Sequence, residues 1–190
     1  KKLKKKPDLA FAVICQKDPN VDEPELEDLY EYGVFGKLVK IFDIPGMGSN
    51  VTIVIQALSR CHLESITKKT PFLMGELTTA KEQMPEKNDT EYKMAIDDVK
   101  KKALEYVQNN EDLPNEAQFA VTNISNEILC INFMCTNLPF SIDEKAKLLG
   151  MPSMKLRAFQ LLGLLNRELQ LLELKNSIRH RTEEKINEEQ

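Results

Sequence analysis

Glycine, histidine and long uncharged runs are scarce in this sequence, and each shortage excludes a class of protein. Seven glycines among 190 residues argue against an all-β protein rich in tight turns. Two histidines in total exclude HExxH and Cys₂His₂ zinc sites. The stretches without a charged residue are short, and one of the longest, Ile128–Ile142, has 15 residues. Because a membrane span needs about 20 mostly apolar residues, the sequence predicts no transmembrane helix.

The composition that remains is close to the average for a globular protein. Hydrophobic residues make up 42% and charged residues 29% of the chain. The net charge of −4 hides an asymmetry, because residues 1–6 (KKLKKK) carry +5 and the rest of the chain carries −9. The basic cluster contains no aromatic residue, so we interpret it as the exposed end of a helix. Contact with nucleic acid or a membrane is the alternative interpretation.

The four cysteines show neither a disulfide framework nor a metal-ligand spacing. We expect free thiols in a reducing compartment, which is the cytoplasm or, as an alternative, an organelle matrix. Cys61 and His62 are neighbours on a predicted strand, so their side chains point to opposite faces and cannot form a nucleophile–base pair. Cys130 and Cys135 lie on different sides of a predicted helix, and core packing is the expected role of both.

The first half of the chain is typical of strands separated by loops. Apolar or β-branched runs predict strands at Leu9–Cys15, Gly33–Phe42, Val51–Leu58, Cys61–Ile66 and Phe72–Leu77. The first of these runs is almost wholly apolar, which predicts a buried strand. The segment IPGMGSN joins the second and third runs, and its proline and glycines predict the loop of an antiparallel hairpin.

The second half is typical of helices. Tyr92, Ile96, Val99, Ala103 and Tyr106 are spaced 4, 3, 4 and 3 residues apart, which places them on one helical stripe. Asn88 and Glu91 stand where a capping box would begin that helix, and Ser141 with Glu144 forms a clearer one further on. Two helices with a break near residues 123–126 are expected within Asn115–Asn137. A short helix ending at Gly150 and a long one from Pro152-Ser153 to about residue 188 should follow.

The long last helix is apolar on more than one side. One seam contains Leu162, Leu165, Leu169 and Leu172, and a second contains Leu164, Leu171, Leu174 and Ile178. A helix that packs on its own bundle and on one further helix explains both seams, and a coiled coil with another chain is the alternative.

No catalytic constellation is present in the sequence. Neither GxxxxGK[ST] nor GxGxxG occurs, so there is no phosphate-binding loop. The acidic residues are spread over loops and helix faces, which gives no support for catalysis by paired carboxylates. We therefore expect this chain itself to have no catalytic residue, no cofactor-binding residue and no metal ligand.

The order of several short motifs resembles the amino-terminal domain of the Lon family of ATP-dependent proteases (endopeptidase La). In the strand-rich half these motifs are CQKDP at 15–19, LYEYGV at 29–34, KLVKI at 37–41 and VTIVIQALSR at 51–60. In the helical half they are NLPFSIDEK at 137–145, LLGLLNREL at 161–169 and LEL at 172–174. The resemblance covers nearly the whole chain.

The resemblance implies an α+β fold, with a small twisted and mostly antiparallel β-sheet subdomain at 1–84 and an α-helical bundle at 85–190 that ends in a long exit helix. It also implies that the domain recognises unfolded or damaged proteins in protein quality control and helps a homo-oligomer, a hexamer in this family, to assemble. ATP hydrolysis with Mg²⁺ and cleavage by a Ser–Lys dyad belong to other modules of an ATP-dependent serine endopeptidase.

The chain departs from the family at its amino-terminal side, where the family's first strands and most of the following helix have no counterpart. The sheet would then have exposed apolar edges that can pair with other chains.

Surplus apolar surface suggests where substrates or partners bind. The candidate contact residues are Ile44, Pro45 and Met47 in the hairpin loop and Leu164, Leu171 and Leu174 on the last helix, although core burial competes for the leucines. An assembly module whose last helix pairs between subunits, with little direct substrate binding, is the second hypothesis. A nucleic-acid-binding sheet domain is the third.

Overall fold

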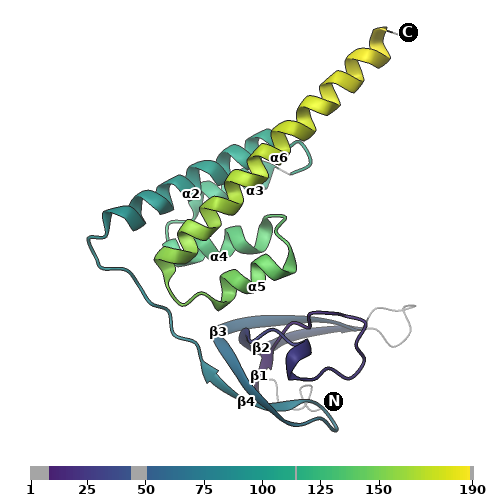
Figure 1. The fold of residues 1–190 in the computed structure, drawn as a ribbon, viewed down its shortest axis with the longest axis vertical. Helices are drawn as coiled ribbons and strands as arrows, with labels where there is room; N and C mark the ends of the chain where they lie inside the picture. Colours follow the sequence, from purple (N-terminus) through teal and green to yellow (C-terminus); the bar gives the residue numbers. More distant parts are fainter. Residues whose placement is uncertain (1–8, 44–50, 114, 189–190) are drawn as a thin grey trace. The chain divides into compact units, whose positions relative to one another are not determined.

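The computed structural model describes residues 9–43, 51–113 and 115–188 (Figure 1). The chain divides into two compact units, Lys1–Lys81 and Glu82–Gln190. The first unit is built on an antiparallel sheet and the second on helices, so the fold class is the expected α+β arrangement with a long helix at its carboxyl end.

The sheet unit contains four strands in the order β1-β2-β3-β4 within the described residues. The strands are β1 (Ala10–Val13), β2 (Tyr32–Asp43), β3 (Val51–Lys68) and β4 (Met74–Thr79), and a 3₁₀ turn, η1, covers Leu26–Asp28. Every neighbouring pair is antiparallel. Strands β1 and β4 therefore form the two edges.

The expected hairpin is confirmed, and two expected strands prove to be one. Strands β2 and β3 pair from Asp43 opposite Val51 to Tyr32 opposite His62. The separate strands predicted at Val51–Leu58 and Cys61–Ile66 were wrong, because Ser59 and Arg60 continue the pairing with β2. Ser59 lies beside a register shift opposite Phe35 and Gly36, which the continuous strand absorbs as a bulge.

The expectation of a buried first strand was also wrong. Strand β1 has four residues, and none of them is fully buried. Its position at the edge of the sheet explains this exposure, because β1 has a neighbouring strand, β2, along only one of its two long edges. Gly33 lies against the end of β1, and a Cβ atom there would stand 2.3 Å from the Val13 carbonyl oxygen. Glycine is needed at this position for that close approach.

The helical unit consists of α2 (Thr90–Asn109), α3 (Asn115–Asn123), α4 (Glu127–Asn137), α5 (Ile142–Gly150) and α6 (Met154–Glu188). These bounds confirm the predicted helices, including the break between α3 and α4. All five residues of the predicted stripe on α2 are buried. The predicted cap of α2 was off by one residue, because Asp89 accepts the Tyr92 N–H at 3.0 Å in place of Asn88.

Capping and buried polar groups fix the ends of the helices that surround the core. The Ser141–Glu144 box at the start of α5 is confirmed, with hydrogen bonds of 3.2 and 3.0 Å. At the start of α6, Arg157 is only 2% exposed and forms an ion pair with Glu82 at 3.0 Å. Gln83 pairs in parallel with Ser153, which ties the first residues of this unit to the beginning of α6.

Candidate functional site

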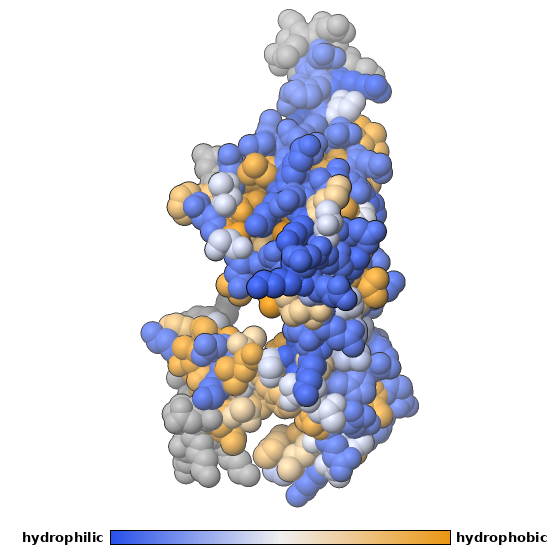
Figure 2. Space-filling model, turned by 90° about the vertical axis from the view of Figure 1, so that its left-hand side faces the viewer, coloured by the Kyte–Doolittle hydropathy of each residue, from blue (hydrophilic) through white to orange (hydrophobic). Residues whose placement is uncertain are grey.

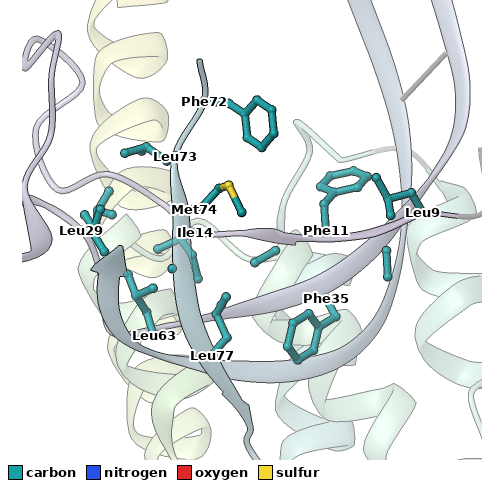
Figure 3. A pocket seen from close by; sticks show the side chains of 14 residues that line it. Leu9, Phe11, Ile14, Leu29, Phe35, Leu63, Phe72, Leu73, Met74 and Leu77 are labelled. Atoms are coloured by element: carbon teal, nitrogen blue, oxygen red, sulfur yellow. The ribbon is translucent and has the colours of Figure 1, made fainter. Parts of the chain in front are cut away.

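The sheet curls so that its two edge strands line one cavity of about 520 Å³. We call it the apolar groove. Strands β1 and β4 are separated by two strands in the sheet order, yet both contribute to the lining. In Figure 3 the side chains of Phe72 and Met74 point toward the side on which Phe11 lies. The curl thus converts a flat sheet face into a concave one.

The lining of the apolar groove contains no charged and no polar side chain. Leu29 and Leu63 are buried at its base, and Phe72, Leu73 and Met74 stay 45–48% exposed at its rim. The full lining is Leu9, Ala10, Phe11, Ala12, Ile14, Leu29, Phe35, Leu63, Ile66, Phe72, Leu73, Met74, Gly75 and Leu77. A wholly apolar lining with an exposed rim selects apolar ligands, because a polar ligand would lose its hydrogen bonds to water there.

The walls of the apolar groove are also sheet edges. Within the described ranges, β1 pairs only with β2, and β4 pairs only with β3. Gly75 holds β4 tightly against β3, since a Cβ atom at this position would stand 2.4 Å from the Ser65 carbonyl oxygen. An extended peptide entering the groove would therefore meet apolar side chains and a strand edge at the same place.

Hydrophobic surface continues along the hairpin beyond β1. Val39 is 60% exposed, and Phe42, Ile53 and Val54 are 42–46% exposed, although all four lie on paired strands. On the face shown in Figure 2, hydrophobic surface gathers over the sheet unit, whereas the visible part of the helical unit is mainly hydrophilic. The candidate residues Ile44, Pro45 and Met47 follow β2 directly in the sequence and lie outside the described residues.

The three candidate leucines of α6 are placed differently from one another. Leu164 is 7% exposed and belongs to the core, so it retains little surface for a partner. Leu171 and Leu174 are 52% and 58% exposed, as is Ile178 at 56%. The first seam is buried or half-buried against the bundle, and the second is exposed from Leu171 onward.

The polar side chains near β3 make no catalytic or metal-binding arrangement among the described residues. Cys61 is fully buried, and burial raises the pKa of its thiol. His62 faces the other way, toward Tyr32, and its Nδ1 lies 2.9 Å from Glu64. No cluster of three or more His, Cys, Asp or Glu residues that would suit a metal ion occurs in the described ranges.

The cysteines of the helical unit lie in apolar surroundings. Cys130 is fully buried in the core cluster and Cys135 packs against it. Burial raises the pKa of the Cys130 thiol, and it raises the pKa of the Cys135 thiol to about 11. Both are poor nucleophiles at neutral pH for that reason.

Sequence reasoning missed the apolar groove as a site. Its residues come from both ends of the first unit, with Leu9–Ile14 on one wall and Phe72–Leu77 on the other. Both segments were recognised as apolar strands, but only the curl of the sheet brings them together. The available signal was the apolar character of the two runs at Leu9–Cys15 and Phe72–Leu77.

The fold and the groove define a class of protein, namely a two-unit α+β binding domain. Residues 1–167 match the family model of the ATP-dependent protease La (LON) substrate-binding domain. The chain belongs to this family.

Proteins named Lon protease are similar over nearly the whole chain. The Lon protease of Parabacteroides distasonis is 35% identical over 180 residues, and that of Flavobacterium johnsoniae is 29% identical over 180 residues. Each alignment covers 95% of this chain but 22% of the relative. The chain thus spans about a fifth of the length of these curated relatives.

A solved structure has the same fold. The N-terminal domain of the Mycobacterium avium complex Lon protease superposes with a TM-score of 0.61 and covers 83% of this chain and 90% of its own. At 19% identity this likeness concerns the fold alone. None of the described helices is long and apolar enough to cross a membrane.

Proposed function

We propose that this chain is the substrate-recognition domain of a Lon-type ATP-dependent serine protease and that it binds apolar segments of unfolded or damaged proteins. Its family is named for substrate binding, and its full-length relatives are named Lon protease. In this proposal the chain contributes no catalytic group. ATP and Mg²⁺ binding and the Ser–Lys dyad belong to the rest of the protein, which works in the cytoplasm.

The apolar groove carries this proposal. Unfolded proteins differ from folded ones in exposing large aliphatic and aromatic side chains, and the groove is lined by such side chains throughout. Its volume of about 520 Å³ lies within the range of small-ligand sites and accommodates two or three large side chains. A groove that binds any large apolar side chain also suits a protease that must accept substrates of many different sequences.

Binding energy would come from two sources that act together. Each large apolar side chain transferred from water into the groove contributes about 1.5–3 kcal/mol before the entropic cost of ordering the peptide is subtracted. The open backbone edge of β1 or β4 would add hydrogen bonds to an extended segment, whatever its sequence. The expected affinity is modest, in the micromolar range of about −8 kcal/mol.

A role in subunit assembly is the second function that a specific observation favours. Leu171, Leu174 and Ile178 expose more than half of their side chains on the described part of α6. Exposed apolar residues at helical spacing are typical of a helix that meets another helix. Assembly through α6 and substrate binding in the sheet unit use different surfaces and can coexist.

The direct test is the binding of a fluorescent peptide of about ten residues that alternates leucine or phenylalanine with polar residues. Leu73→Lys and Met74→Lys place a charge at the half-exposed rim of the groove, and each should weaken binding about tenfold. Leu58→Lys is the matched control, because Leu58 is 49% exposed on β3 and does not line the groove. Equal loss of binding in all three variants would contradict a site in the groove.

The same peptide must also be measured with the full-length protein. Binding to the 190-residue chain and to the full-length protein with similar affinity is expected. A full-length protein that excludes the peptide would show that another segment of the same protein occupies the groove, and the proposed client site would then be wrong.

A further inference from the structure

A second cavity, of about 500 Å³, adjoins the apolar groove, and we call it the polar pocket. Leu29 and Leu63 line both cavities, but the polar pocket also includes three glutamates, Glu27, Glu31 and Glu64. We propose that it binds the guanidinium or ammonium group of an arginine or lysine that stands beside the apolar segment of a bound substrate. This inference rests on the proposed function and adds a charge preference to the apolar one.

Backbone hydrogen bonds fix the walls of the polar pocket. The Lys17 N–H donates to the Asp28 carbonyl oxygen at 2.7 Å, and the Leu63 N–H donates to the Glu31 carbonyl oxygen, also at 2.7 Å. The first bond closes the loop that precedes β2, and the second ties the end of that loop to β3. The pocket is therefore formed before a ligand arrives, and a preformed site loses less binding free energy to ordering.

The ionic groups of the polar pocket leave it negatively charged. Lys17 is the only lysine or arginine among the described residues that line it, and its Nζ already donates to the Glu27 carbonyl oxygen at 2.7 Å. Nδ1 of His62 and Oγ1 of Thr78 each lie 2.9 Å from Oε1 of Glu64. Hydrogen bonds from these two groups lower the pKa of Glu64, so its carboxylate is ionised at neutral pH. A cation is the ligand that this charge favours.

The surroundings of the carboxylates favour an organic cation over a metal ion. No group of three or more His, Cys, Asp or Glu residues that could hold a metal ion occurs in the part of the chain that the structure describes. The polar pocket instead combines its carboxylates with Leu26, Leu29 and Leu63. An arginine or lysine side chain has the same two parts, because a long aliphatic stem carries the charged head. The stem can lie on the leucines while the head approaches the carboxylates.

The two shared leucines join the polar pocket to the apolar groove. A substrate side chain that contacts Leu29 or Leu63 in the groove lies next to the pocket. An extended chain advances about 3.3 Å per residue, so a basic residue one to three positions away is within reach. An acidic residue at the same place would be repelled by the carboxylates. The pocket would thus discriminate among apolar segments by the charge beside them.

Three versions of the fluorescent apolar peptide test this discrimination in the 190-residue chain. They carry arginine, glutamine or glutamate beside the apolar block, in one series before it and in another after it. In at least one series the arginine peptide should bind about fivefold more tightly than the glutamine peptide, and the glutamate peptide should bind more weakly. The preference should shrink at about 0.5 M salt. Equal affinities throughout both series would overturn the proposal.

Variants of the glutamates locate the preference. Glu31→Gln and Glu64→Gln should each remove most of the preference for arginine while the glutamine peptide binds as before, which also shows that the variants are folded. Glu23→Gln is the matched control, because Glu23 is exposed on the same loop and does not line the polar pocket. An equal loss of preference in the control would assign the effect to net charge and would overturn the site.

The NMR signals of His62 provide a readout that does not depend on the apolar groove. The chain has two histidines, and His180 on α6 serves as the internal reference. N-acetylarginine amide at millimolar concentration should shift the imidazole signals of His62 and leave those of His180 in place. N-acetylglutamine amide should shift neither. Equal shifts of both histidines with the arginine compound, or no shift of either, would overturn the polar pocket as a cation site.

The polar pocket and the apolar groove can therefore fail separately. If all peptides bind with the same affinity and His62 does not respond, the polar pocket is wrong and the groove remains. If no peptide binds while N-acetylarginine amide still shifts His62, the groove is wrong and the cation site remains.

Discussion

Arg167 on α6 holds Glu144 at the start of α5, with its Nη2 atom donating to Glu144 Oε2 at 3.1 Å. The same carboxylate accepts the N–H of Ser141 at 3.0 Å as the second half of a capping box. One glutamate therefore closes the first turn of α5 and ties that helix to α6. Its ionisation should couple the stability of the helical unit to pH.

The first prediction concerns this coupling. Arg167 and the Ser141 N–H lower the pKa of Glu144 from its ordinary 4.5 to about 2. As the pH falls, Glu144 is protonated in the unfolded chain at a higher pH than in the folded chain. The ionised carboxylate therefore stabilises the fold above pH 4.5, and this contribution is lost as the pH falls from about 4.5 to about 2. Glu144→Gln should remove this part of the pH dependence in urea unfolding measured between pH 7 and pH 2.5.

Glu173→Gln is the matched control for that experiment. Glu173 is exposed on α6 and forms no ion pair among the described residues. The control should keep the pH dependence of the unaltered protein. A Glu144→Gln variant with the same pH profile as the control would refute the coupling.

The buried arginine of α6 gives a second prediction. Arg157 is 2% exposed and ion-paired with Glu82 at 3.0 Å, so removing the carboxylate leaves a buried charge without its partner. Glu82→Ala should lower the free energy of unfolding by about 2 kcal/mol. The double variant Glu82→Leu with Arg157→Leu should recover most of that loss in denaturant unfolding. Additive losses in the double variant would contradict this interpretation of the pair.

Two glycines give opposite predictions for the same substitution. Gly75→Ala should destabilise the sheet unit by about 1–3 kcal/mol, because its Cβ would stand 2.4 Å from a backbone oxygen of β3. Gly163→Ala should stabilise the helical unit by up to about 1 kcal/mol, because the site is open and alanine favours the helix. Thermal unfolding of both variants checks the contrast, and a shift of the same sign in both would be evidence against it.

The two leucine seams of α6 should respond differently to truncation. Leu165 is fully buried, so Leu165→Ala should cost about 2–5 kcal/mol. Leu174 is 58% exposed, so Leu174→Ala should change the stability of the monomer by no more than about 0.5 kcal/mol. Urea unfolding at low protein concentration separates these effects from assembly through α6, and similar losses in both variants would place Leu174 in the core.

The thiols provide a prediction that needs no substitution. Cys15 is exposed, whereas Cys61 and Cys130 are buried and burial holds the pKa of Cys135 at about 11. A thiol reagent at pH 8 should therefore modify Cys15 quickly and the other three only on unfolding. Rapid modification of more than one thiol in the native protein would show that the described packing is wrong.

The sequence predicted the helical unit better than the sheet unit, and the reason is physical. The stripe from Tyr92 to Tyr106 and the Ser141–Glu144 box act within a single helix, so local spacing and capping were sufficient. The burial of β1 and the length of β3 depend on which strands lie beside them, and that information is not local. The groove depends on the curl of the sheet, which no single segment of the sequence encodes.

Site-specific cross-linking in the full-length protein tests the central claim most directly. A photoreactive phenylalanine analogue would replace Leu73 at the rim of the groove and, as a control, Leu58 outside it, and a labelled unfolded protein would then be added. We predict cross-links to the unfolded protein from position 73 and not from position 58. Cross-links from position 58 alone, or from neither position while the unfolded protein is still degraded, would contradict substrate recognition in the apolar groove.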